Sequence, residues 1–78
     1  MAERITRANV EARAEAVNRG LRDGLRVVVE GRYGYTALDL YDERGMVRTL
    51  TTGVTKREAY DYLGAMIETL WIVGRDAR

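Results

Sequence analysis

The chain has 78 residues, 46% of them hydrophobic, and its net charge is +1. This length and apolar content suit one small domain with a modest core. The absence of cysteine and histidine excludes disulfides, thiolate metal sites and the commonest general base. The near-neutral charge argues against the strongly basic surface that is typical of nucleic-acid-binding proteins.

The first predicted element is a helix over residues 6–20. Thr6 is a typical N-cap residue, because its hydroxyl can accept a hydrogen bond from a free amide of the first turn. Apolar residues then recur at helical spacing, at Val10, Ala14, Val17 and Leu21. Gly20 is expected just past the end of the helix, in the left-handed conformation that glycine adopts most easily.

Three strands are predicted next, over residues 25–30, 35–41 and 46–51. Residues 31–34 should form the first turn, in which both glycines can adopt positive φ. Residues 42–45 are typical of a type I turn that is closed by a glycine bulge. The first two strands alternate clearly, whereas Met46, Val47 and Leu50 do not agree on one side of the third.

The last predicted element is a helix over residues 56–73. Thr55 and Glu58 have the spacing of a capping box, in which each side chain binds the backbone amide of the other residue. Gly64 lies inside this helix at a cost of about 1 kcal/mol relative to alanine, which indicates close packing against the sheet or the first helix. The expected buried stripe is Ala59, Leu63, Met66, Leu70 and Val73, widened by Tyr62, Ile67 and Trp71.

The predicted fold is therefore a single α+β domain over residues 1–78 with the order α-β-β-β-α. Its simplest arrangement is a three-stranded antiparallel meander with both helices on one face. The opposite face and the adjoining turn would then present the predicted partner-binding residues Arg26, Arg32, Tyr33, Tyr35, Asp39 and Tyr41. Tyrosine and arginine are enriched at the energetic centres of protein interfaces, although tyrosine is also common on ordinary sheet faces.

No catalytic constellation is recognisable in the sequence. Serine is absent together with histidine and cysteine, so the usual nucleophile–base triads cannot form. We expect a protein that is not an enzyme and that uses no cofactor or metal ion. No apolar segment resembles a signal peptide or approaches the roughly 20 residues of a membrane span, so we expect a cytoplasmic location in a bacterial host.

The element order resembles that of the double-stranded-RNA-binding domain. That family carries a Ser-Lys-Lys-x-Ala-Lys-like motif at the start of its last helix, and the matching run here is Thr55-Lys56-Arg57-Glu58-Ala59-Tyr60. The resemblance implies that Lys56 and Arg57 contact phosphates across a groove. Tyr60 stands where the family has its final basic residue, and the first hairpin lacks the Gly-Pro-x-His pattern of the family.

A second resemblance covers residues 34–71. Gly-Tyr-x-x-Leu, a glycine-closed hairpin and Thr-Lys-Arg-Glu-x-x-x-Tyr-Leu-x-x-Met look like small proteins of phages and prophages. All basic residues except Lys56 are arginine, which is typical of GC-rich bacterial and phage genomes. The resemblance implies an accessory factor that binds host proteins, as the anti-CRISPR proteins do when they block defence complexes.

Three functional hypotheses follow. The first is a non-enzymatic accessory protein of a phage or mobile element that binds a host or phage protein and blocks it sterically, for example as an inhibitor of a defence complex. The second is a small nucleic-acid-binding protein that uses Lys56 and Arg57. The third is a homodimeric structural protein whose sheet face or edge strand pairs with itself.

Overall fold

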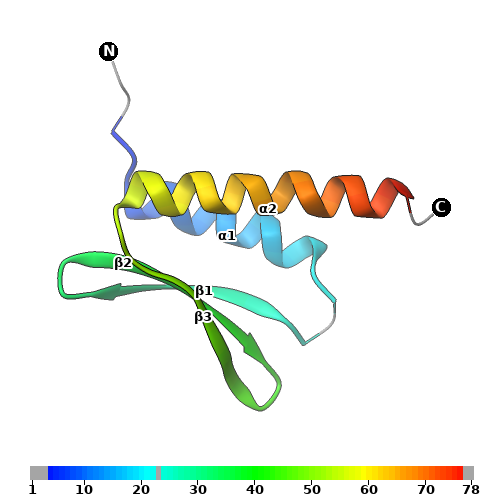
Figure 1. Cartoon of the computed structure of the whole chain (residues 1–78), viewed down its shortest axis with the longest axis horizontal. Helices are drawn as coiled ribbons and strands as arrows, with labels where there is room; N and C mark the ends of the chain where they lie inside the picture. The colour runs from blue at the N-terminus through cyan, green and yellow to red at the C-terminus, as the bar shows by residue number, and fades with distance from the viewer. Residues whose placement is uncertain (1–3, 23, 77–78) are drawn as a thin grey trace.

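The computed structural model describes residues 4–22 and 24–76. The chain forms α1 (Arg7–Gly20), β1 (Arg26–Arg32), β2 (Tyr35–Asp42), β3 (Gly45–Val54) and α2 (Lys56–Asp76). The strands form one antiparallel sheet in the order β1-β2-β3, and both helices lie on the same face of it (Figure 1). The α+β fold and the meander that the sequence predicts are thus confirmed.

The core lies between the helices and the sheet. Its buried apolar side chains come from both layers and are Val10, Ala14, Val17, Val27, Val29, Leu38, Ala59 and Leu63. On β1 the buried residues alternate with more exposed ones, as period-two side-chain packing requires. Complete burial of a single side chain such as Leu38 or Leu63 contributes about 1.5–3 kcal/mol, so these few residues supply much of the stability.

Both helices begin at the capping residues that the sequence predicts. The Thr6 hydroxyl accepts a hydrogen bond from the Asn9 amide at 3.3 Å, and the Asn9 side chain accepts one from the Thr6 amide at 2.9 Å. At α2, the Glu58 amide donates to the Thr55 hydroxyl at 3.1 Å, and the Thr55 amide donates to the Glu58 carboxylate at 2.9 Å. These bonds satisfy amides that a helix start otherwise leaves without partners.

The glycines near the helices act through close packing. Gly20 is the last residue of α1 and not the left-handed residue beyond it, because the following Leu21 is extended and caps the helix. A Cβ at Gly20 would lie 3.3 Å from a methyl group of Leu70, so the two helices approach closely there. A Cβ at Gly64 would overlap the guanidinium of Arg13 on α1, which confirms the expected close packing at this position.

The first hairpin is tighter than the sequence predicts. Gly31 belongs to β1 and pairs with Thr36, so the turn contains only Tyr33 and Gly34. Their φ angles of 54° and 80° have the signs that a type I′ turn requires. Gly31 therefore lies in the strand without positive φ, and Tyr33 adopts it together with Gly34, because the type I′ turn matches the right-handed twist of the strands.

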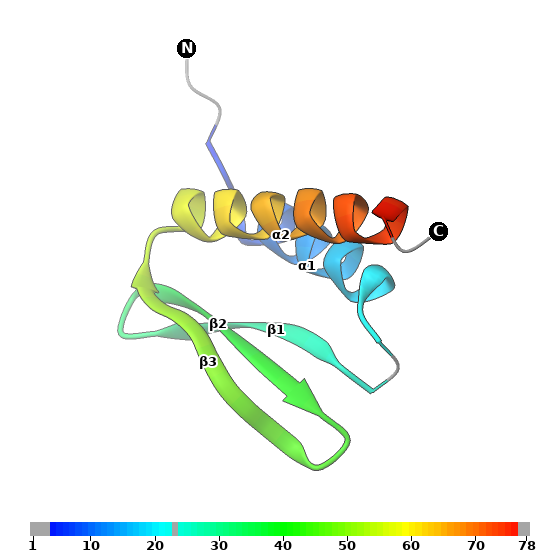
Figure 2. The ribbon, with the colours of Figure 1, turned by 45° about the vertical axis from the view of Figure 1, so that its right-hand side comes forward.

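The strand β3 contains register shifts that explain its unclear facing. Leu38 pairs with Thr51 but the next residue, Asp39, pairs with Thr49, so one residue of β3 is extra. Two further register shifts lie nearby, one between Thr36 and Leu38 and one between Leu40 and Tyr41. Each bulge interrupts the alternation of side chains, so no single period-two pattern describes the strand. Figure 2 shows the β2–β3 hairpin bending away from the helices toward its turn.

The end of α2 projects past the rest of the fold. At 1.5 Å per residue, the 21 residues of α2 extend about 10 Å further than the 14 residues of α1. Trp71 and Val73 are therefore 63% and 58% exposed, and their predicted place in the buried stripe is wrong. No helix within residues 4–22 and 24–76 combines the length and apolar character needed to cross a bilayer.

Candidate functional site

The sheet face opposite the helices carries most of the predicted partner-binding residues. We call this surface the open face, and define it by the β1 and β2 residues that alternate with the core positions. They are Arg26, Val28, Glu30 and Arg32 on β1, and Tyr35, Ala37, Asp39 and Tyr41 on β2. The pairs Arg26–Tyr41 and Arg32–Tyr35 lie six residues apart along β1, so the face is about 20 Å long.

At one end of the open face an arginine packs on an aromatic ring. Arg26 is directly opposite Tyr41, and its guanidinium carbon lies 5.2 Å from the centre of the tyrosine ring. Such a contact between a cation and a ring near the protein surface contributes about 0.5–1 kcal/mol. It also limits the rotamers of Arg26, so this cation is held over the face and less is lost in ordering it when another molecule binds.

The centre of the open face holds a buried ion pair. Asp39 is 0% exposed, and its carboxylate accepts hydrogen bonds from the Arg32 guanidinium and, at 2.9 Å, from the Thr49 hydroxyl. The sequence places Asp39 on this face correctly, but the expectation that it is accessible to a partner is wrong. Its role in the structure is to hold Arg32, whose side chain remains 39% exposed.

The register explains how this ion pair forms. Arg32 pairs with Tyr35, and Ala37 lies between Tyr35 and Asp39 on the same face. The Arg32 side chain therefore reaches diagonally across the sheet, past the Glu30–Ala37 pair, to bind Asp39.

The tip of the first hairpin presents two tyrosines. Tyr33 is 99% exposed and Tyr35 is 56% exposed. Tyr33 has a φ of 54°, a conformation that costs an L-residue with a Cβ roughly 1–2 kcal/mol. The adjacent Gly34 also has positive φ, at no steric cost.

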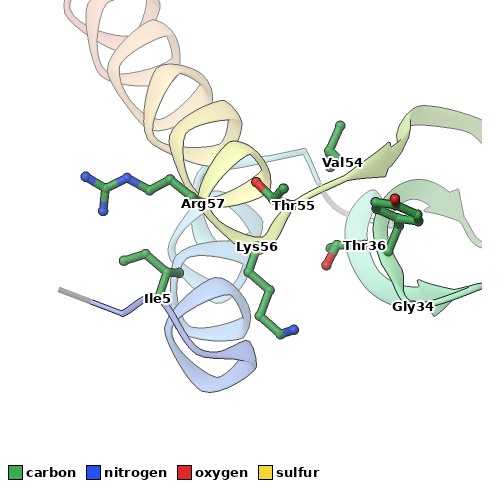
Figure 3. A pocket seen from close by; sticks show the side chains of 8 residues that line it. Ile5, Gly34, Thr36, Val54, Thr55, Lys56 and Arg57 are labelled. Carbon is green, nitrogen blue, oxygen red and sulfur yellow. The ribbon is translucent and has the colours of Figure 1, made fainter. Parts of the chain in front are cut away.

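The two basic residues singled out by the sequence lie close to this tip. Lys56 and Arg57 line an open hollow of about 470 Å³ between the start of α2 and the first hairpin (Figure 3). Tyr35 lines the same hollow. Arg57 is paired with Asp61 at 3.9 Å. The predicted partner-binding residues and the two predicted phosphate-binding residues are far apart in the sequence. In the structure both groups lie beside Tyr35.

Two positions beside the open face and the hollow have no clear signal in the sequence. Thr49 supports Asp39 from β3, but the bulges of that strand conceal which of its side chains share the open face. Thr36 belongs to the core-facing side of β2 and yet lines the hollow beside Lys56. Only the pairing of the strands and the approach of α2 bring these two hydroxyls to their sites.

Within the described residues, no cluster of three or more acidic, histidine or cysteine side chains has the arrangement of a metal site. Comparisons of the chain with models of protein families, with curated proteins and with solved structures each return no match. The functional argument therefore depends on the geometry of the open face and of the hollow.

Proposed function

We propose that this protein works by binding a partner protein through the open face and the tip of the first hairpin, as an accessory protein of a phage or mobile element. The contact would be centred on Tyr33, Tyr35 and Arg32, with Arg26 and Tyr41 at the far end. Its effect would be steric: the bound domain covers a functional surface of the partner, as an inhibitor of a defence complex would.

The observation that carries this proposal is the conformation of Tyr33. A bulky aromatic side chain stands almost entirely in solvent at a turn position where asparagine or glycine is much less strained. Neither burial nor turn geometry accounts for a tyrosine there. Strain of this kind is concentrated at functional sites, and an exposed tyrosine supplies a large contact area at a low cost in conformational entropy.

The ion pair at the centre of the face supports the same conclusion. Asp39 is completely buried, yet the side chain of its partner Arg32 is 39% exposed, so the domain uses an interior carboxylate to orient a partly exposed arginine. Arginine held in this way loses less conformational entropy on binding, and arginine and tyrosine together are typical of interface hot spots. The net charge of +1 gives little support for a surface that binds a nucleic-acid backbone.

The test is an affinity capture from bacterial host lysate with three versions of the full chain: wild type, the double variant Tyr35→Ala/Tyr41→Ala, and the control Tyr62→Ala. Tyr62 is a suitable control because it is 38% exposed but lies on α2, away from the open face. Circular dichroism establishes that each variant is folded. The lysate is used with and without nuclease, at low and at moderate salt.

We expect wild type and Tyr62→Ala to retain the same protein in stoichiometric amount, after nuclease treatment and in moderate salt. The double variant should lose that protein while remaining folded. Unchanged capture by the double variant would contradict the proposal. Capture of nucleic acid alone, abolished by salt, would also contradict it, because binding to a phosphate backbone weakens steeply as salt is added.

A further inference from the structure

One face of α2 is largely exposed and carries no charge. A shallow hollow of about 270 Å³ runs along this face, and every residue that lines it belongs to the same helix: Tyr62, Ala65, Met66, Thr69 and Leu70. Ile72 and Val73 continue the face along the part of α2 that projects past α1, and they are 52% and 58% exposed. We call these seven residues the α2 stripe. Glu68 is the only charged residue between positions 62 and 74.

The α2 stripe lies on the side of the helix that faces away from α1. Arg13 of α1 contacts α2 at the Tyr60 ring and carbonyl and at Gly64. Each residue of a helix is turned by about 100° from the one before it, so residues two positions further along point to the opposite side of the axis. Figures 1 and 2 show α1 beside α2 and the β2–β3 hairpin bending away from both. Tyr62 and Ala65 are accordingly exposed.

The spacing along the stripe is that of a contact between two helices. Tyr62, Ala65, Thr69 and Ile72 follow one another at intervals of three, four and three residues, as the a and d positions of a coiled coil do. The two central side chains are small, so a second helix can approach to the short end of the usual range of about 8–10 Å. The Thr69 hydroxyl donates to the Ala65 carbonyl at 2.9 Å, so it already has a partner when the stripe is covered.

The edges of the sheet are less suited to binding a second copy of the chain. On β1, the Asn18 side chain of α1 accepts a hydrogen bond from the Val27 amide at 2.7 Å and donates one to the Val27 carbonyl at 3.1 Å. Arg7 donates to the Val29 carbonyl at 3.3 Å. On the other edge, three register shifts interrupt β3. Side chains that occupy edge groups and bulges that twist an edge both oppose strand pairing between molecules.

We propose that two copies of this chain form a dimer through the α2 stripe, with the two helices antiparallel. About a two-fold axis at position 67, Ala65 of each copy faces Thr69 of the other, and Tyr62 faces Ile72. The small pairs then lie together at the centre, and a large pair closes each end. No charged side chain lies between the helices, and their dipoles are opposed. The projecting end of each α2 is covered by the other copy.

The available area supports a weak dimer. Tyr62 is 38% exposed, and Ile72 and Val73 are a little more than half exposed. Two copies of the stripe would bury on the order of 1,000 Å² in total, which is the low end for a specific interface. We expect a dissociation constant on the order of 10–100 µM, so the protein is a monomer in dilute solution and a dimer when it is concentrated.

The test is sedimentation velocity of the full chain from about 5 to 500 µM. The mass of wild type should rise from 8.9 kDa toward twice that value. Ala65→Lys should raise the dissociation constant at least about tenfold, because it places an unpaired charge between the helices. The matched control Ala12→Lys makes the same substitution at an exposed position of α1 and should dimerise like wild type. Circular dichroism establishes that both variants are folded.

A mixture of two variants tests the antiparallel orientation. Thr69→Glu should weaken self-association as Ala65→Lys does, since it also places a charge at the centre of the stripe. Position 65 of one copy faces position 69 of the other, so an equimolar mixture of the two variants should recover dimers through an ion pair. The variant Tyr35→Ala/Tyr41→Ala leaves the stripe unchanged and should dimerise normally, so failure here is separate from failure at the open face.

The proposal is overturned if wild type remains a monomer over this concentration range, or if Ala65→Lys dimerises as well as wild type. It is also overturned if Ala12→Lys weakens the dimer as much as Ala65→Lys does, because the effect would then come from the added charge alone. A mixture of Ala65→Lys and Thr69→Glu that stays monomeric would exclude the antiparallel arrangement. If Ala65→Lys does not fold, Thr69→Glu decides the result alone, since Thr69 is exposed.

Discussion

Replacement of Tyr33 by asparagine should make the protein more stable and a poorer binder. Tyr33 has a φ of 54° and is 99% exposed, so the substitution relieves backbone strain and removes almost no buried surface. Asparagine tolerates the left-handed region and is favoured in type I′ turns, because its short side chain can form local hydrogen bonds. Stability and function should therefore change in opposite directions.

The magnitude follows from the strain. A left-handed conformation costs an ordinary L-residue about 1–2 kcal/mol, and asparagine avoids part of this, so the free energy of unfolding should rise by about 1 kcal/mol. In a domain of 78 residues this corresponds to an increase in Tm of about 4–8 °C. Urea unfolding monitored by circular dichroism measures the change directly.

The neighbouring position supplies a control of opposite sign. Gly34 has a φ of 80°, so Gly34→Ala should lower the free energy of unfolding by about 1 kcal/mol. A loss of stability in Tyr33→Asn would refute the reasoning, because it would mean that Tyr33 makes a stabilising contact. Full capture of the partner by the stabilised Tyr33→Asn variant would show that the exposed ring is not part of the interface.

Three further predictions concern the packing that supports the fold, and urea unfolding measures all of them. Gly64→Ala should destabilise wild type by about 1 kcal/mol, because Arg13 must leave the Tyr60 carbonyl at 2.9 Å and the Tyr60 ring at 3.6 Å, and should stabilise an Arg13→Ala background by about 1 kcal/mol. The same sign in both backgrounds would contradict this account. Asp39→Ala should cost about 2 kcal/mol, since it deprives Arg32 and the Thr49 hydroxyl of their partner; a loss below about 0.5 kcal/mol would contradict the importance of the ion pair. Leu63→Ala should cost about 3 kcal/mol through lost burial and a residual cavity, and a loss typical of surface positions would place Leu63 outside the core.

The sequence predicts which residues lie on the open face better than it predicts which of them are exposed to solvent. Strict alternation along β2 places Tyr35, Asp39 and Tyr41 on one side, and the strand pairing confirms this. Alternation cannot show that Asp39 is buried, because its carboxylate is enclosed by partners from two other strands, Arg32 on β1 and Thr49 on β3. The side chains of Arg32 and Asp39 come close enough to pair only when β1 and β2 are in the observed register.

The hollow beside the start of α2 is a second place where the sequence predicts one part of a site and only the structure shows the rest. The Thr55–Glu58 spacing predicts where α2 starts, and therefore that Lys56 and Arg57 lie in its first turn. It contains no information about which strand residues face that turn. Thr36 and Lys56 line the same hollow because α2 packs back across the sheet, so their proximity is visible only in three dimensions.

Local chemistry in the sequence therefore determined the order of the elements, the two helix starts and most of the core stripe, because caps and periodicity act over only a few residues. The tertiary structure alone decided the positive φ of Tyr33, the bulges of β3, the burial of Asp39 and the exposure of Val73. These features arise from strand twist, register and the unequal lengths of the two helices. They depend on how distant segments fit together, which short-range patterns do not encode.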